Sequence, residues 1–121
     1  MILVDTSVWI DHLHRSDPRL AGLLERGEVV THPMVIGELA LGSLHERDRF
    51  LSLLSNLPDV ASATHAEVMV LVEERSLHET GLSLVDAHLL ASTLVTPSTL
   101  LWTRDRRLSG VAERLGVAAG R

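Results

Sequence analysis

Four acidic residues lie far apart along the chain at positions that an open α/β fold brings together. They are Asp5, Glu38, Asp86 and Asp105. Asp5 directly follows the apolar run 2–4, and Asp105 comes shortly after the apolar run 100–102. Because doubly wound sheets bind ligands at the carboxyl ends of their strands, we expect both aspartates at that edge. A pocket of carboxylates at this place predicts a divalent metal ion.

The donor set indicates which metal and which chemistry to expect. Hard oxygen ligands suit Mg²⁺ or Mn²⁺, which bind through a few carboxylates together with substrate phosphates. Such an ion polarises a phosphoryl oxygen and lowers the pKa of a bound water. Phosphodiester hydrolysis is therefore the reaction that fits best. The chain has no cysteine, which excludes thiolate metal sites and disulfides.

Three of the acids also have a purely structural interpretation. Asp5 stands where a helix begins and could be its N-cap. Asp86 closes the sequence S-x-x-D that starts at Ser83, which is a capping box. Asp105 lies in the mixed-charge stretch 104–107, which could be a solvated turn. Each of these acids taken alone is weak support for a metal site.

Glu38 is the most informative of the four acids. Its neighbours in the stretch 35–41 are nearly all apolar, so the sequence predicts a carboxylate buried within a helix. An unpaired buried charge is costly, and a metal ion would neutralise it. A buried pair with an arginine is the competing account.

Short apolar runs alternate with helical segments along the chain, which predicts a parallel sheet flanked by helices. We expect strands at residues 2–4, 29–30, 60–61, 99–102 and 117–118. We expect helices from residue 6 onward, from 18 to about 27, from 33 to about 42, and over 46–57, 64–80, 83–95 and 106–115. The sequence thus predicts one α/β domain over residues 1–121.

Targeting signals are not expected. Residues 1–5 leave no room for a secretory signal. The longest stretch without Asp, Glu or Arg, 87–103, falls short of the ~20 apolar residues of a membrane-spanning helix. A cytoplasmic protein without a membrane partner is therefore predicted.

The charge balance first argues against a nucleic-acid partner, because the net charge is −5. Sixteen acidic residues less the four singled out leave 12, against 11 basic residues that are all arginine. Arginine binds phosphate through a planar fork, which suits a phosphate-rich partner, although biased genome composition accounts for the missing lysines equally well.

Five arginines are candidates to steer RNA phosphates around the site. They are Arg15, Arg19, Arg104, Arg106 and Arg107. The alternative is that they only solvate the surface. Trp9 and Trp102 lie in apolar runs and are expected in the core rather than stacked on bases.

The motifs around the four acids resemble those of a known family. The segments are Ile2-Leu3-Val4-Asp5-Thr6-Ser7-Val8-Trp9, Ile36-Gly37-Glu38-Leu39, Ser83-Leu84-Val85-Asp86-Ala87 and Trp102-Thr103-Arg104-Asp105. They look like the four acidic motifs of PIN domains, in the same order, and cover essentially the whole chain. The chain most resembles the VapC-type ribonuclease toxins of prokaryotic toxin–antitoxin systems.

This resemblance implies a PIN-like fold and an Mg²⁺- or Mn²⁺-dependent RNA endonuclease that is often a homodimer and is held inactive by a cognate antitoxin. It implies that Asp5 and Asp86 are the principal metal ligands, that Glu38 completes the first site, and that Asp105 acts directly or through water. These four acids are then also the catalytic residues.

Ser7 and Thr103 would hydrogen-bond to the ligands. Many relatives carry another acid shortly after the fourth motif, whereas this chain has Arg106 and Arg107. Whether one or two metal ions bind therefore stays open.

Two other functions remain as alternatives. One is a different metal-dependent phosphohydrolase, such as a haloacid-dehalogenase-like phosphatase, but that class has an acid where this chain has Ser7. The other is a catalytically silent PIN-like binding module. A module without catalysis would have no reason to keep a costly Glu38 in an apolar helix. The apolar stretch 68–72, together with the first helix, is a candidate interface with a second subunit or an antitoxin.

Overall fold

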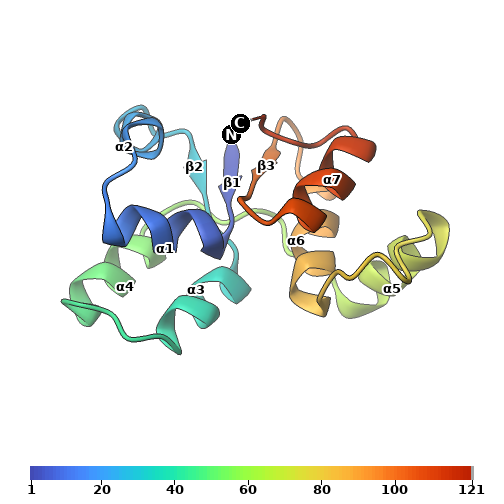
Figure 1. Ribbon diagram of the computed structural model, residues 1–121, viewed down its shortest axis with the longest axis horizontal. Coiled ribbons are helices and arrows are strands. Elements are labelled where there is room, and N and C mark those ends of the chain that lie inside the picture. The colour runs from blue at the N-terminus through green and yellow to red at the C-terminus, as the bar shows by residue number, and fades with distance from the viewer. Residues whose placement is uncertain (121) are drawn as a thin grey trace.

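A sheet of three parallel strands forms the centre of the computed structural model, which describes residues 1–120 (Figure 1). Strand β1 (Ile2–Val4) lies between β2 (Val29–Val30) and β3 (Leu100–Trp102). Because the central strand β1 is covered on both faces, all of its residues are apolar. The last residue of the predicted domain, 121, lies outside the described part of the chain.

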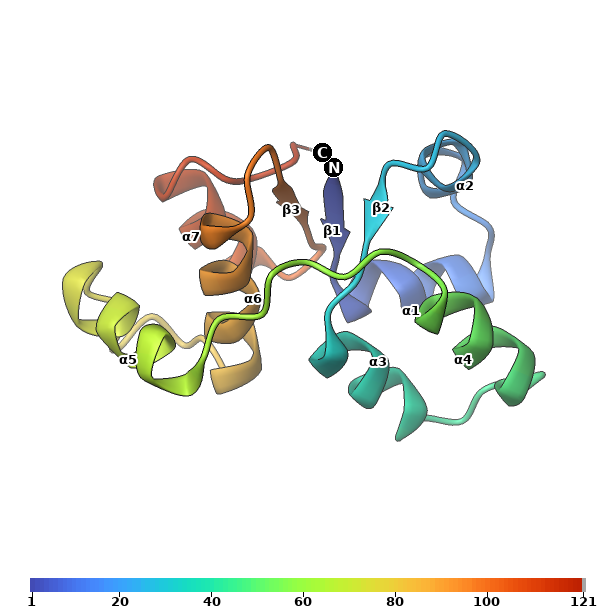
Figure 2. The same cartoon turned by 180° about the vertical axis from the view of Figure 1, so that it is seen from behind.

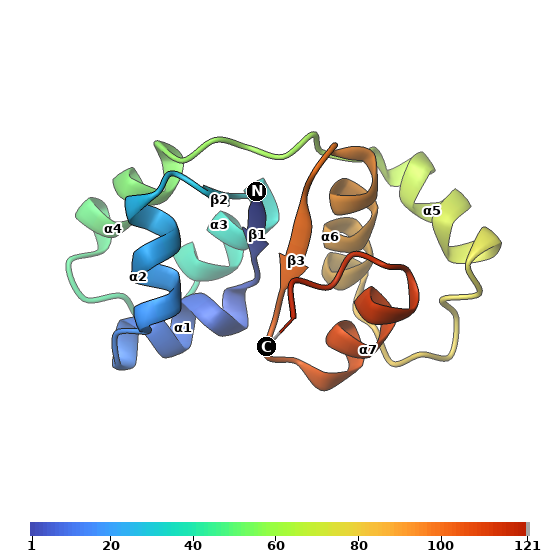
Figure 3. The same cartoon turned by 90° about the horizontal axis from the view of Figure 1, so that it is seen from above.

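The helices gather in two groups at the two sides of the sheet (Figures 1 and 3). Beside β2 lie α1 (Thr6–His14), α2 (Pro18–Glu25), α3 (Pro33–Ala40) and α4 (Arg47–Ser55). Beside β3 lie α5 (His65–Glu74), α6 (Leu84–Val95) and α7 (Arg106–Arg114). The segment 56–64 joins the groups across the sheet (Figure 2). The predicted α/β class with a parallel sheet is confirmed. Within residues 1–120, no helix is long and apolar enough to cross a membrane.

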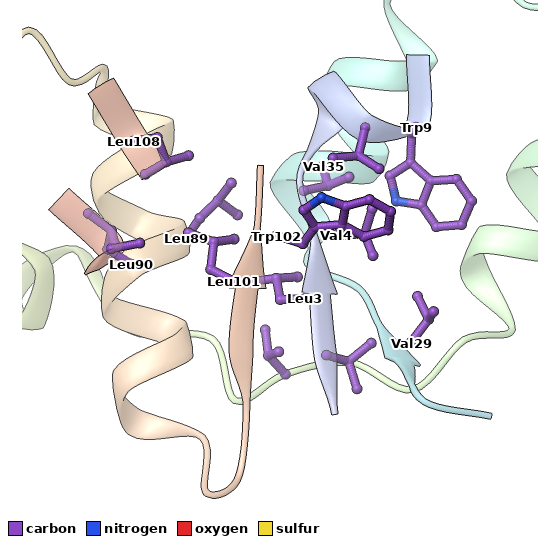
Figure 4. Close-up of a cluster of buried hydrophobic side chains, with 14 of the residues drawn as sticks. Leu3, Val4, Trp9, Val29, Val35, Leu89, Leu90, Leu101, Trp102 and Leu108 are labelled. Atoms are coloured by element: carbon purple, nitrogen blue, oxygen red, sulfur yellow. The ribbon is translucent and has the colours of Figure 1, made fainter. Parts of the chain in front are cut away.

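The core lies between the sheet and both helix groups (Figure 4). Leu3 and Leu101 come from neighbouring strands, and Leu90 contributes from α6. The two tryptophans are core residues as predicted, since Trp9 is 3% exposed and Trp102 is 5% exposed.

Two predicted strands, 60–61 and 117–118, are wrong. The structure has only isolated bridges at these places, Thr31 with Asp59 and Leu101 with Ala118. The first segment cannot extend its pairing backward because Pro58 has no N–H to donate. Both segments still reach the sheet edge through a few backbone hydrogen bonds.

Helix α5 ends well before the predicted residue 80. Ser76 adopts a left-handed conformation (φ 53°), and the N–H of Leu77 donates to the carbonyl of Val72 at 2.9 Å. The N–H of Ser76 donates to Glu73, which completes a Schellman motif. This turn buries Leu77 against the core. The expected stop at Gly81 was wrong because serine takes the position usually held by glycine.

A buried histidine connects the two helix groups. His32 caps α3, with Nδ1 accepting from the N–H of Met34 at 3.0 Å. Its Nε2 lies 3.1 Å from Oγ of Ser92 on α6, and that oxygen accepts from the N–H of Ala63. Because Nδ1 accepts, the neutral ring donates from Nε2. Burial lowers the pKa of His32, the nearby His88 lowers it further, and Asp59 opposes the shift.

This lowered pKa predicts a pH-dependent stability. The unfolded chain takes up the proton first, near the ordinary value of 6.5, so His32 stabilises the fold fully above that pH. The contribution is lost as the pH falls from there through the folded-state pKa. We expect the melting temperature to drop between pH 7.5 and 5.5, and to drop less in His32→Asn, which can still cap α3. An equal drop in both proteins would contradict this role.

Candidate functional site

Asp5 lies at the centre of the candidate site, at the carboxyl end of β1. Its backbone N–H donates to the carbonyl of Trp102 at 2.9 Å, which extends the pairing of β1 with β3. Its carboxylate is buried, at 6% exposure, and Oδ2 accepts from the hydroxyls of Ser7 at 2.8 Å and Thr103 at 2.7 Å. The two hydroxyls fix the carboxylate and compensate for its lost hydration.

The Asp5 side chain does not cap the helix that follows it. Asp5 occupies the N-cap position of α1, yet its side chain makes no capping hydrogen bond. The structural interpretation of Asp5 is therefore wrong, because its carboxylate turns to Ser7 and Thr103 instead.

Asp86 is both a capping residue and a member of the acidic group. It forms the predicted capping box with Ser83, in which Oδ2 accepts from the Ser83 N–H at 3.1 Å. Burial raises the pKa of the Asp86 carboxyl, the hydrogen bonds from Ser83 offset part of this, and the negative charges of Asp5 and Asp105 raise it again. Asp86 thus lies close enough to Asp5 and to Asp105 for their charges to act on it.

Asp105 caps α7. Its Oδ1 accepts from the N–H groups of Arg107 at 2.9 Å and Leu108 at 3.0 Å. The Asp105 N–H donates to Oγ1 of Thr103 at 3.0 Å. Thr103 therefore connects Asp105 to Asp5, since its hydroxyl accepts from the Asp105 N–H and donates to the Asp5 carboxylate.

Glu38 is exposed, so the predicted burial of its carboxylate is wrong. Val35 and Leu39, four residues apart, face the core from one side of α3, and the Glu38 side chain lies outside that buried face. Its Oε1 accepts from the hydroxyl of Thr6 at 2.8 Å. Thr6 directly follows Asp5, so this bond brings Glu38 to the rim of the site. Sequence reasoning missed Thr6, although it lies within the first acidic motif.

The four carboxylates share one feature that fits a cation. In each, one oxygen is held by the chain and the other accepts no hydrogen bond within residues 1–120. In the same part of the chain, no three Asp, Glu or His side chains are already arranged so that they could hold a metal ion together. The repulsion among the three aspartates and their unused oxygens nevertheless suit a hard divalent ion, which would be held by Asp5, Asp86, Glu38 and Asp105.

The candidate RNA-steering arginines have different surroundings. Arg104 bridges two acids outside the carboxylate group, Asp11 at 3.0 Å and Asp17. Burial would raise the pKa of Asp17, but the N–H groups of Leu20 and Arg19 and the charge of Arg104 hold it below its ordinary value. Arg104 is thus neutralised, and sequence reasoning did not foresee its partners.

The other arginines are less constrained. Arg19 stacks on the ring of Trp102 at 4.3 Å and donates to the carbonyls of Ala119 and Gly120. The Arg107 side chain runs along Gly81, where an added β-carbon would stand 2.9 Å from its Cδ. Arg15 and Arg106 are exposed and form no ion pair within residues 1–120.

The chain is similar to proteins that are already known. Residues 2–114 match the family described as PIN domain. The chain is 52% identical over 118 residues to Ribonuclease VapC32 of Mycobacterium tuberculosis strain CDC 1551 / Oshkosh. The match covers 98% of this chain and 95% of that relative, and the protein of the same name from strain ATCC 25618 / H37Rv matches equally well.

The hydroxyl of Thr103 should matter for metal affinity. Thr103→Val keeps the shape of the side chain but removes one donor to Asp5 and the acceptor for the Asp105 N–H. We expect Mn²⁺ affinity to fall about 10- to 100-fold, as is common when a partner of a metal ligand is lost. Isothermal titration calorimetry measures this, with Thr80→Val as the control because, within residues 1–120, the Thr80 hydroxyl bonds only the carbonyl of Leu77. Equal losses in both variants would show that the effect is not specific to the site.

Proposed function

The chain belongs to the PIN domain family, and from this premise we propose that it is a metal-dependent endoribonuclease. We propose that it hydrolyses RNA phosphodiester bonds as the toxic component of a type II toxin–antitoxin system, acting in the cytoplasm. The name of its VapC32 relative, a ribonuclease, supports this activity. The observation that carries the proposal is that Thr103 hydrogen-bonds to both Asp5 and Asp105 at the carboxyl edge of the sheet, where the charges of both raise the pKa of Asp86.

The residues of the chain have separate tasks in this proposal. Bound Mg²⁺ or Mn²⁺ would polarise the scissile phosphoryl group and lower the pKa of the attacking water. Asp5 would bind the ion through the oxygen that Ser7 and Thr103 leave unused. Asp86 would do so through the oxygen not engaged by Ser83. Because these carboxylates are already oriented, little ordering is left to be done when the metal binds.

Glu38 and Asp105 complete the proposed ligand set from its two sides. Thr6 holds Glu38 through Oε1, and the start of α7 holds Asp105 through Oδ1. Arg106 and Arg107 follow Asp105 where many relatives have an acid. We therefore propose that one ion is bound more firmly than a second.

The structure bears on the two alternative functions. The exposure of Glu38 removes the argument that its burial cost excludes a silent binding module. A phosphatase that uses Asp5 as a nucleophile is disfavoured, because that class has an acid at the position of Ser7, whose hydroxyl here donates to Asp5. Direct measurement of cleavage separates the nuclease from the binding module.

Cleavage of structured RNA by the purified protein is the deciding experiment. We expect cutting with Mg²⁺ or Mn²⁺ and none with EDTA. Asp5→Asn and Asp86→Asn should each lower the rate about a hundredfold or more, since even partners of metal ligands contribute 10- to 100-fold. Asp48→Asn, an exposed acid on α4, serves as the matched control and should cut normally.

Metal binding without cleavage of any RNA would instead favour the binding module. Cutting that survives in Asp5→Asn and Asp86→Asn would place the active site elsewhere.

An apolar groove beside the acids supports the proposal of a cognate antitoxin. The groove has a volume of about 330 Å³ and is lined by Ile10, Leu13, Leu39 and Leu44, with Glu38 at its edge. Ile10 and Leu13, which are 44% and 42% exposed, line the same groove, and contiguous apolar surface of this kind marks interaction sites. We propose that the antitoxin docks an apolar segment here and inserts a basic side chain among the carboxylates.

A second apolar surface supports the proposed homodimer. Between α5 and α6 lies a hollow of about 280 Å³, lined by Val70, Leu71, Leu94 and Val95. Val70 and Val95 are 54% and 47% exposed. Pairing of two copies would remove this surface from water.

Sedimentation velocity tests both partners in one series. The chain alone should sediment with twice the mass of one copy, and Val70→Glu should shift it to a monomer because dimerisation would bury the new charge. Leu13→Glu should remain a dimer, keep its cleavage activity and fail to bind the antitoxin. Leu53→Glu, at an exposed position on α4, should behave like the wild type. A monomeric wild type, or a Leu13→Glu protein that is still inhibited, would contradict the respective proposal.

A further inference from the structure

A large groove that the proposed mechanism does not use opens beside the carboxylates. It has a volume of about 810 Å³, within the range of pockets that hold small ligands, ~300–1,000 Å³. Arg106, Ser109, Gly110 and Glu113 line one wall. Their spacing of i, i+3, i+4 and i+7 places them on one face of α7. The opposite face of α7 is in the core, so this wall is rigid.

The other wall comes from distant parts of the chain. Arg19, near the start of α2, and the ring of Trp102 line it, and Thr103 lies at the end nearest the carboxylates. Figure 3 shows α2 and α7 on either side of β3, whose end leads into Thr103. The groove is thus continuous with the residue whose hydroxyl holds Asp5.

Two arginines that line the groove, Arg19 and Arg106, are not paired with an acidic side chain of residues 1–120. Within residues 1–120, the Arg19 side chain donates to the uncharged carbonyls of Ala119 and Gly120 and forms no ion pair. Arg106 forms no ion pair within residues 1–120. The acid on the same wall, Glu113, lies about 10 Å farther along α7 from Arg106 at 1.5 Å per residue.

Arg104 also lines the groove, but its two acidic partners occupy its guanidinium. Asp17, one of these partners, is in turn neutralised by that pair. The cations left to meet a phosphate are Arg19 and Arg106.

We infer that this groove is a subsite for the RNA nucleotide next to the scissile bond. The phosphate of that nucleotide lies between Arg19 and Arg106, and its sugar and base extend along α7 past Ser109 and Gly110. The inference rests on the proposed ribonuclease function and adds the path by which the strand leaves the metal site. It also gives Arg106 a role as a contact to substrate phosphate.

Gly110 allows the groove to be filled without disturbing the core. A β-carbon added to this residue meets no heavy atom within 4 Å. Gly110→Ala should therefore be tolerated, and it should stabilise α7 slightly because alanine is the better helix former. Gly110→Trp extends a large side chain into the space that the nucleotide would use. Comparing Gly110→Trp with Gly110→Ala therefore separates the effect of filling the groove from the effect of losing the glycine.

Binding is measured by fluorescence anisotropy with a labelled single-stranded RNA, in an Asp5→Asn background that prevents cutting. We expect Gly110→Trp to weaken binding about tenfold or more, because its side chain would displace the nucleotide, and Gly110→Ala to leave binding unchanged. Arg106→Gln should weaken binding and reduce the slope of log K against log salt by about 0.7, the value for one phosphate contact on a single strand. Arg49→Gln, an exposed arginine on α4, should leave that slope unchanged.

Cleavage by the same variants without the Asp5 substitution separates this inference from the proposed function. Gly110→Trp should raise KM and leave kcat nearly unchanged. If the wild type cuts RNA while Gly110→Trp and Arg106→Gln bind and cut like their controls, the subsite is wrong and the ribonuclease stands. If the wild type neither binds nor cuts RNA, both are wrong. Should Gly110→Trp fail to fold by circular dichroism, the salt slope of Arg106→Gln decides.

Discussion

The structure depends on the pairing of β1 with β3 up to and including Asp5. The register sets Val4 beside Trp102, and the next backbone hydrogen bond runs from the N–H of Asp5 to the carbonyl of Trp102. This pairing places Thr103 opposite Asp5, where its hydroxyl reaches the carboxylate. A buried carboxylate without such donors would be strongly unfavourable. The same contact that makes Asp5 tolerable in the fold therefore orients it for a metal ion.

A second contact sets the distance between the two helices that carry the remaining acids. Glu38 lies on α3 and Asp86 on α6, and these helices belong to different groups at the two sides of the sheet. His32, at the start of α3, hydrogen-bonds to Ser92 in the middle of α6. Because His32 is buried and its pKa is lowered, this bond links the two helix groups without burying a charge. One polar contact in the core thus connects the helix that carries Glu38 to the helix that carries Asp86.

The sequence predicted the carboxyl-edge acids more reliably than the conformations around them. Asp5 and Asp105 followed apolar runs that became paired strands, so their placement needed only the α/β pattern. The ends of α2 and α7 could also be predicted, because a glycine follows each helix and glycine readily adopts the left-handed conformation that ends helices. Gly27 and Gly116 do adopt it, with φ angles of 66° and 76°. Ser76 ends α5 in the same conformation without this signal. The exposure of Glu38 was not foreseeable, because the direction of a short helix relative to the core is decided by tertiary packing.

The helix starts explain how the chain keeps several carboxylates together before any cation binds. Asp5 and Asp105 hold the N-cap positions of α1 and α7, and Asp86 lies in the first turn of α6. The N-terminal end of a helix carries partial positive charge, which favours anions near it by about 0.3–1 kcal/mol each. Three such ends partly offset the mutual repulsion of these aspartates. A divalent ion would relieve the repulsion that remains.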